Sequence, residues 1–109
     1  MSGGTLATAL EVMTQPRSST WIDYDPAWLV ALAREQLPAL APALSRCTRA
    51  LVESKAYIYF VSGDEANQPG SEWQFDRNEF LRDPVRGELV LDVLKDGRIG
   101  GIEFLSRLR

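Results

Sequence analysis

The sequence contains no histidine, a single cysteine and no long run of apolar residues. Without histidine, the serine and cysteine triads built on an imidazole base are excluded, and the commonest zinc ligand is missing. Cys47 cannot form an internal disulfide, and no apolar stretch approaches the roughly 18 residues that suggest a membrane helix. Residues 1–10 lack the basic start and apolar core of a signal peptide. These absences predict a cytoplasmic protein of bacterial type without a membrane segment.

The composition is that of one ordinary globular domain, with 109 residues of which 45% are hydrophobic and 25% are charged. The net charge is −3, and all of it lies in residues 53–109, because acidic and basic residues balance in residues 1–52. Binding to nucleic acid depends on neutralising phosphates, so this charge argues against a direct nucleic-acid partner. It favours a basic protein partner instead.

The clearest local pattern is a β-hairpin in residues 89–105, centred on Asp96-Gly97. Asp-Gly predicts a two-residue type I′ turn, in which both central residues have positive φ. The turn would set the following register: Lys95 opposite Arg98, Leu94 opposite Ile99, Val93 opposite Gly100, Asp92 opposite Gly101, Leu91 opposite Ile102, Val90 opposite Glu103 and Leu89 opposite Phe104. One face of this hairpin is strongly apolar and needs a cover.

Residues 25–53 form a predicted helical half, preceded by an N-terminal segment, residues 1–20, in which residues 5–15 fit a short helix. Asp25-Pro26 is a typical helix start, and this helix should run to Leu37. After Pro38 and Pro42, apolar residues at helical spacing predict a second helix ending near Val52. Cys47 lies on that apolar stripe, so we interpret it as a core residue and not as a nucleophile.

Residues 55–62 and 73–80 have strand composition and are separated by a polar loop, residues 63–71. With the hairpin they give a β-meander over residues 55–105. The predicted fold is a single α+β domain, residues 1–109. In this fold, two or three N-terminal helices pack on one face of a four-stranded antiparallel β-meander that ends in the Asp-Gly hairpin.

The hairpin also carries a motif: Leu91-Asp92, then Asp96-Gly97-Arg98, then Gly101-Ile102-Glu103, behind the strand Ala56-Tyr57-Ile58-Tyr59-Phe60. Over residues 53–105 this pattern resembles a small bacterial family known as domain of unknown function 2283. The helical first half and the longer loop at residues 63–71 depart from that family. The resemblance implies a fold without assigned catalytic residues. Some such small domains are suspected antitoxins or immunity proteins, so it also implies a protein that binds a toxin.

Asp92 and Glu103 are the only arrangement that suggests catalysis, because they lie diagonally on one face of the hairpin. Paired carboxylates on a sheet serve metal-dependent enzymes and glycosidases. Carboxylates on a solvated surface are the commoner case, so we rank this enzyme hypothesis last. Gly101, opposite Asp92, predicts the close approach of a backbone or an aromatic ring.

We therefore predict a non-catalytic protein-binding module without a metal or cofactor. The leading hypothesis is an immunity protein or antitoxin that occludes a basic toxin domain. Its predicted partner-binding residues combine an aromatic side chain with carboxylates: Asp64, Glu65, Glu72, Trp73 and Asp76. An alternative binding group is formed by Trp21, Tyr24 and Trp28, which are more commonly a lid on the core. The alternative function is a structural or regulatory homo-oligomer, such as a homodimer, formed through sheet edges.

Overall fold

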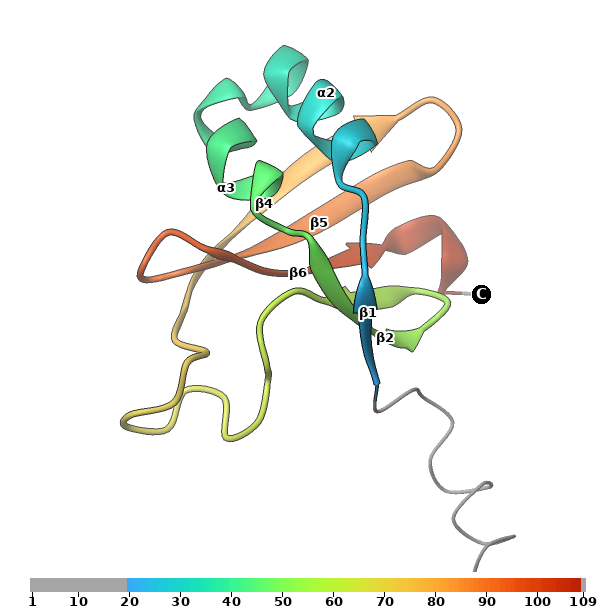
Figure 1. The fold of residues 1–109 in the computed structure, drawn as a ribbon. Helices are drawn as coiled ribbons and strands as arrows, with labels where there is room; N and C mark the ends of the chain where they lie inside the picture. The colour runs from blue at the N-terminus through green and yellow to red at the C-terminus, as the bar shows by residue number, and fades with distance from the viewer. Residues whose placement is uncertain (1–19, 109) are drawn as a thin grey trace, which may run out of the picture.

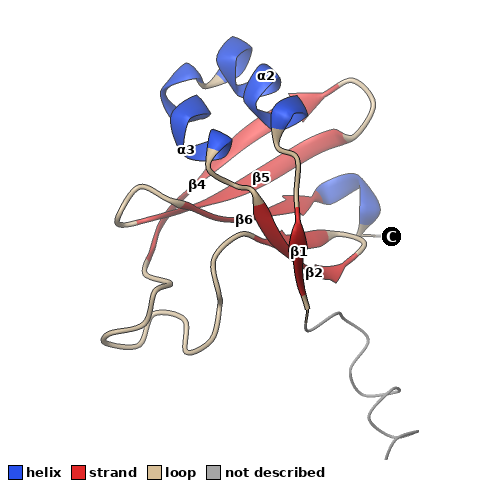
Figure 2. Ribbon diagram, in the orientation of Figure 1, coloured by secondary structure: helices blue, strands red, loops and turns tan. Residues whose placement is uncertain are grey.

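The computed structural model describes residues 20–108, which form one antiparallel sheet of six strands with two α-helices on one of its faces (Figure 1 and Figure 2). The elements in chain order are β1 (Trp21–Asp23), α2 (Ala27–Gln36), the 3₁₀ helix η1 (Pro38–Leu40), α3 (Ala41–Ser45), β2 (Arg49–Ser54), β3 (Tyr57–Tyr59), β4 (Phe75–Asp83), β5 (Gly87–Leu94), β6 (Ile99–Phe104) and the 3₁₀ helix η2 (Leu105–Arg107). The strand order in the sheet is β1-β2-β3-β6-β5-β4. The short helix predicted for residues 5–15 lies outside the described residues.

The predicted four-stranded meander behind N-terminal helices is wrong, because the sheet has six strands and both helices follow β1. Residues 49–54, predicted as the end of a helix, form β2 between β1 and β3. The predicted strand over residues 55–62 shrinks to β3, because the chain turns back between β2 and β3. Tertiary pairing decides these segments: Ala50 is completely buried in the sheet, and that burial outweighs a helical apolar spacing.

The first helix matches its sequence signals closely. α2 begins at Ala27, whose N–H donates to Oδ1 of Asp25 at 3.0 Å, and it ends at Gln36. The Asp25 carboxylate therefore satisfies one of the free amides at the start of the helix.

Within residues 20–108, no helix is both long enough and apolar enough to cross a membrane.

The hairpin register is confirmed for the four pairs that lead up to its turn: Leu89 with Phe104, Val90 with Glu103, Leu91 with Ile102 and Asp92 with Gly101. Beyond Asp92 the prediction is wrong, because Val93 pairs with Ile99 and Gly100 forms a bulge. The predicted type I′ turn is also wrong. Gly97 has φ +91°, but Asp96 does not have a positive φ.

Hydrogen bonds define the turn that replaces it. The N–H of Gly97 donates to the carbonyl of Leu94 at 2.9 Å, and the N–H of Leu94 donates to the carbonyl of Arg98 at 2.9 Å. This is a three-residue hairpin loop in which a type I turn is followed by a left-handed glycine. Relative to the predicted register, the extra loop residue shifts the pairing by one residue and the Gly100 bulge shifts it back. Only the pairs at the tip therefore differ from the prediction, and both faces below the tip are as predicted.

The main core lies between the helices and the apolar hairpin face (Figure 2). Leu29 and Ala33 of α2 and Leu44 of α3 are completely buried there. The hairpin contributes buried side chains from two strands: Leu89, Leu91, Val93, Ile99, Ile102 and Phe104. Removing this apolar area from water is the main driving force for folding, so a polar substitution within the cluster would be severe.

A second, smaller core lies apart from the first and contains Val61, Trp73 and Leu94. Tyr59, Ala66 and Phe75 pack against it. It forms where the chain between β3 and β4 returns to the sheet near the β5–β6 turn. The sheet is therefore covered by helices on one face and, at one end of the other face, by a loop.

Candidate functional site

The candidate site is the long connection between β3 and β4, residues 60–74, which we call the β3–β4 loop (Figure 1). Its start is bonded to the bulge in β6, because the N–H groups of Phe60 and Val61 both donate to the carbonyl of Gly100, at 2.7 and 3.1 Å. Its end is held by Trp73, whose ring lies edge-on to Tyr59 with centroids 5.6 Å apart. A loop fixed at both ends presents its middle in a defined position.

Trp73 fits the sheet because β6 has a glycine at this point. A Cβ atom on Gly100 would lie 2.6 Å from Cζ3 of Trp73, which is closer than non-bonded carbon atoms approach. The side chain of Trp73 is only 7% exposed. It was predicted as an aromatic anchor for a partner, but the structure places it in the second core. Trp73 therefore fixes the end of the loop to the sheet, and its ring is not available on the surface.

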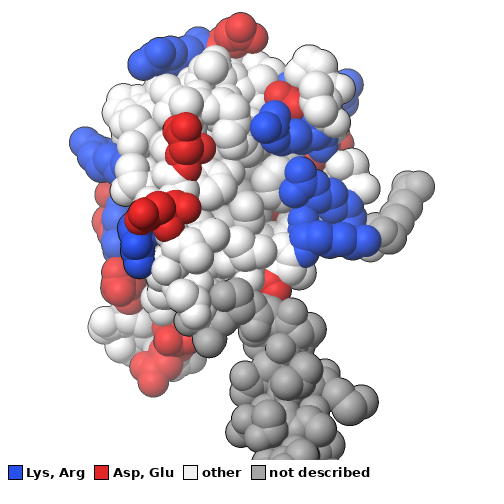
Figure 3. Space-filling model, turned by 45° about the vertical axis from the view of Figure 1, so that its right-hand side comes forward, with Lys and Arg blue, Asp and Glu red and all other residues white. Residues whose placement is uncertain are grey.

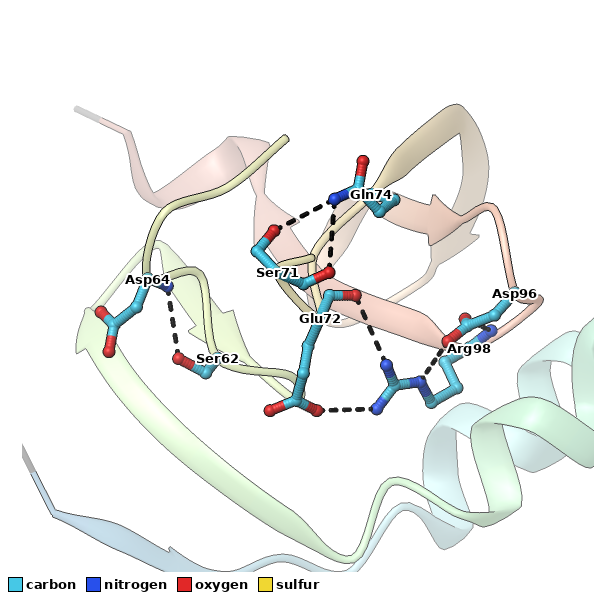
Figure 4. Close-up of polar contacts among 7 residues, drawn as sticks. All are labelled: Ser62, Asp64, Ser71, Glu72, Gln74, Asp96 and Arg98. Carbon is cyan, nitrogen blue, oxygen red and sulfur yellow. Dashed lines mark hydrogen bonds and ion pairs between the residues drawn. The ribbon is translucent and has the colours of Figure 1, made fainter. Parts of the chain in front are cut away.

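Hydrogen bonds within the loop hold its shape. The N–H of Asn67 donates to the carbonyl of Trp73 at 2.8 Å, and Oδ1 of Asn67 accepts the N–H of Phe75 at 2.9 Å. Nε2 of Gln74 donates to the carbonyl of Gln68 at 2.6 Å. Figure 4 shows the bond that the same nitrogen donates to Oγ of Ser71, at 3.2 Å. Asparagine bridges of this type are common in tight turns, and here they limit the conformations open to the loop.

The loop and the start of β4 are acidic: residues 62–76 contain four carboxylates and neither lysine nor arginine. Asp64 and Glu65 are exposed, and no ion pair to either is formed within residues 20–108. In Figure 4 the carboxylate of Asp64 is directed away from the other charged side chains. Asp76 pairs instead with Arg77 at 2.7 Å, so its charge is partly balanced. Asp64 and Glu65 thus offer the free negative charge of the site.

Unlike Asp64 and Glu65, Glu72 forms an ion pair with Arg98 (Figure 4). Arg98 donates from Nη1 to Oε1 of Glu72 at 3.1 Å and from Nε to Oδ2 of Asp96 at 2.8 Å. The backbone N–H of Arg98 and its guanidinium lower the pKa of Asp96. Sequence reasoning missed Arg98, since Glu72 lies 26 residues away and no local pattern links them. Arg98 ties the acidic loop to the hairpin turn.

Asp92 and Glu103, the carboxylates of the enzyme hypothesis, lie on the hairpin face away from the helices. Asp92 accepts the hydroxyl of Tyr57 on one oxygen and Nδ2 of Asn78, at 2.7 Å, on the other. Burial and the neighbouring Asp92 raise the pKa of Tyr57. Both oxygens of Asp92 are therefore used in a structural network that joins β3, β5 and β4. The described residues contain no group of three or more acidic or cysteine side chains placed to hold a metal ion.

Gly101 has the role that its position opposite Asp92 predicted. A Cβ atom there would lie 2.6 Å from the hydroxyl oxygen of Tyr57 and 2.8 Å from the carbonyl oxygen of Ile58. The missing side chain lets the Tyr57 ring cross β6 and reach Asp92. The predicted approach of an aromatic ring is confirmed.

The alternative aromatic group is divided between core and surface. Trp28 stacks on Phe104 with centroids 6.2 Å apart, and its Nε1 donates to the hydroxyl of Tyr24 at 3.1 Å. The guanidinium of Arg86 covers the outer side of the Trp28 ring at 3.8 Å. Trp21 lies on β1 and is partly exposed. Tyr24 and Trp28 therefore form a lid on the main core.

Charged side chains are unevenly spread over the surface. On the face drawn in Figure 3, the largest group of blue Lys and Arg side chains lies toward the right, with others at the top and the left edge, and most red Asp and Glu side chains lie toward the left and the bottom. Comparison with protein-family models, with curated proteins and with solved structures found no match. The resemblance of residues 53–105 to a family stays a prediction, and the site has to be interpreted from its own geometry.

Proposed function

We propose that this chain is a non-catalytic protein-binding module that recognises a basic protein surface through the β3–β4 loop. One observation carries the proposal: Asp64 and Glu65 are exposed and form no ion pair with any residue of the described range 20–108, and the buried Trp73 fixes their loop to the sheet. Binding residues are concentrated on loops that a rigid scaffold positions. A loop already held in one shape loses less conformational entropy when it binds, which favours affinity.

The charge of the loop indicates what it would recognise. Free carboxylates at an exposed loop attract a basic surface over distances near the Debye length and speed the encounter of the two proteins. Glu72 and Asp76 are already paired with arginines, so they contribute less to this attraction. We place the contact at Asp64 and Glu65, with Glu72 and Asp76 at its margin and Trp73 beneath it.

An immunity protein or antitoxin remains our more specific proposal. It is supported by the acidic loop, which suits the basic cleft of a toxin such as a nuclease, and by the resemblance of residues 53–105. Such an inhibitor acts by covering its partner, so it requires neither a cofactor nor a metal. The hydrogen bonds of Asp92 with Tyr57 and Asn78 also support binding over catalysis, because each oxygen of that carboxylate already accepts a structural hydrogen bond.

The test compares two single charge reversals, using the protein encoded by the adjacent open reading frame as the partner. Glu65→Lys reverses a charge on the loop. Glu35→Lys makes the same reversal on the exposed surface of α2 and is the matched control. We expect Glu65→Lys to slow association several-fold at about 50 mM salt and less at about 300 mM, since salt screens steering charges. The control should associate like the unmodified protein. Equal association rates for both variants would place the contact outside the loop.

A further inference from the structure

A cleft of about 450 Å³ opens between the end of α3, the first two residues of the β3–β4 loop and the β5–β6 turn. Its walls are largely apolar and include Ala43, Phe60, Val61 and Ile99. This volume lies within the usual range for small-molecule sites, which combine apolar walls with a few polar groups that orient the ligand. The cleft shares no residue with the proposed contact at Asp64 and Glu65.

Three arginines line the cleft, although the chain as a whole is acidic. Arg49 is held by Asp23, with Nη1 donating to Oδ1 at 2.8 Å, and Arg98 is held by Asp96 and Glu72. Arg46 is different: it is exposed, and it forms no ion pair within residues 20–108. Its guanidinium therefore keeps all five N–H donors for a ligand.

Free carbonyl groups at the C-terminal end of a helix carry partial negative charge and would repel an anion bound at Arg46. At the end of α3 this repulsion is reduced. The carbonyl of Pro42 accepts Oγ of Ser45 at 2.6 Å, and that of Leu44 accepts the N–H of Cys47 at 3.0 Å. With their carbonyls already bonded, these residues present less free negative dipole to the cleft. Cys47 lies at the cleft but is only 6% exposed, and burial raises its pKa to about 12, so its thiol stays neutral.

We propose that this cleft binds a small organic anion, with its carboxylate or sulfonate on Arg46 and its apolar body against Phe60, Val61 and Ile99. The proposal goes beyond the function assigned to the loop. A planar guanidinium binds such an oxyanion through two parallel hydrogen bonds, which gives both strength and orientation. The apolar walls select a ligand with a hydrocarbon or aromatic body over a simple inorganic ion.

The test uses two fluorescent probes that differ only in charge. 8-Anilinonaphthalene-1-sulfonate carries the anion and an aromatic body, while N-phenyl-1-naphthylamine has the same rings without the sulfonate. We expect the sulfonate probe to bind the folded protein more tightly than the neutral one. Arg46→Gln should weaken binding of the sulfonate probe about tenfold and leave the neutral probe unchanged, because only the charged pair is lost.

Two further variants place the probe in this cleft. Arg34→Gln removes an exposed arginine from α2, outside the cleft, and should bind the sulfonate probe like the unmodified protein. Thr48→Trp fills the mouth of the cleft from an exposed position and should reduce binding of both probes. The proposal is overturned if Arg46→Gln and Arg34→Gln bind equally well, or if Thr48→Trp has no effect while circular dichroism shows a native fold.

Discussion

Gln36 and Arg82 lie 46 residues apart and form two hydrogen bonds between α2 and the outer edge of the sheet. Nε2 of Gln36 donates to the carbonyl of Arg82 at 2.7 Å, and Oε1 of Gln36 accepts the N–H of Arg82 at 2.8 Å. A neighbouring strand would bind Arg82 in the same way. Open edge strands invite pairing between chains, so this side chain closes part of the β4 edge. It is a specific argument against an oligomer built through that edge.

The first prediction is that Gln36→Ala promotes self-association. The substitution frees both backbone groups of Arg82 and extends the open part of β4. We expect light scattering to show a mass that rises with concentration, and urea unfolding to show a loss of about 1–2 kcal/mol for the two hydrogen bonds. Glu35→Ala, one residue away and exposed, is the control and should stay close to the unmodified protein. A monomeric Gln36→Ala variant at all concentrations would show that Gln36 is not needed to protect the edge.

The second prediction concerns the contact between Gly100 and Trp73. Gly100→Ala places a Cβ atom 2.6 Å from the Trp73 ring and 3.0 Å from Cδ2 of Leu94, so the ring must move. Overpacking of this kind costs about 1–3 kcal/mol of unfolding free energy, measured by chemical denaturation. The cost should shrink in a Trp73→Leu background, where the large ring is absent. Additive effects of the two substitutions would mean that the ring does not sense the new methyl group.

The third prediction concerns the bond between Tyr57 and Asp92. The sequence alone suggests that Asp92→Ala is nearly neutral for folding, but the structure gives Asp92 two donors. We expect Asp92→Ala to lower the free energy of unfolding by about 1–2 kcal/mol, because at this half-buried position water restores only part of the hydrogen bonding that Tyr57 and Asn78 lose. Tyr57→Phe should cost less, and the double variant should cost less than the sum of both. If the double variant costs as much as the two single variants added together, the two side chains are not energetically coupled.

The fourth prediction is a loss of stability at alkaline pH. Burial raises the pKa of Cys47 from 9.0 to about 12, and it also raises the pKa of Tyr57 above its ordinary 10.0. Between the unfolded and folded pKa values the unfolded chain holds fewer protons, so the free energy of unfolding falls as the pH rises. The effect is absent below about pH 9 and grows above it. Urea unfolding at a series of pH values measures it.

Cys47→Ala is the matching control for that measurement. It should flatten the pH dependence just above pH 9, where the Cys47 thiol is the first of these groups to ionise in the unfolded chain. The native thiol should also react slowly with a disulfide reagent at neutral pH, because the thiolate is the reactive form. A pH dependence that Cys47→Ala does not change would assign the alkaline loss to the tyrosines alone.

The hairpin was predictable because its signals are local. Asp96-Gly97 marks the turn, and the alternation of apolar residues sets the two faces. The predicted pair of Asp92 with Gly101 is right because the extra residue in the loop and the bulge at Gly100 offset each other. The bulge at Gly100 was not predictable in this way, because it depends on Phe60 and Val61 binding one carbonyl from another strand. Local spacing was also misleading for β2, where apolar residues at helical intervals belong to a strand that is paired on both sides.

The candidate site shows the same limit. Asp64 and Glu65 are adjacent in a stretch without lysine or arginine, so the acidic character of the loop could be predicted from the sequence. Trp73 has polar neighbours on both sides, Glu72 and Gln74, and therefore resembles a surface residue. Its burial depends on a glycine 27 positions later (100 − 73) that leaves room for its ring. Contacts between distant residues decide which side chains of a loop are anchors and which are offered to a partner.

The two attachments of the β3–β4 loop separate the residues that fold the protein from those free to diversify. Val61 and Trp73 hold the ends of the loop in the second core, while Asp64, Glu65 and the turn at Pro69-Gly70 lie outside it. Asp64 and Glu65 can therefore be substituted without touching the second core, whereas Ala66 packs against that core and Asn67 holds the shape of the loop through its bonds to Trp73 and Phe75. Under the proposed function, substitutions at Asp64 and Glu65 would change which surface the loop recognises without competing with the stability of the second core.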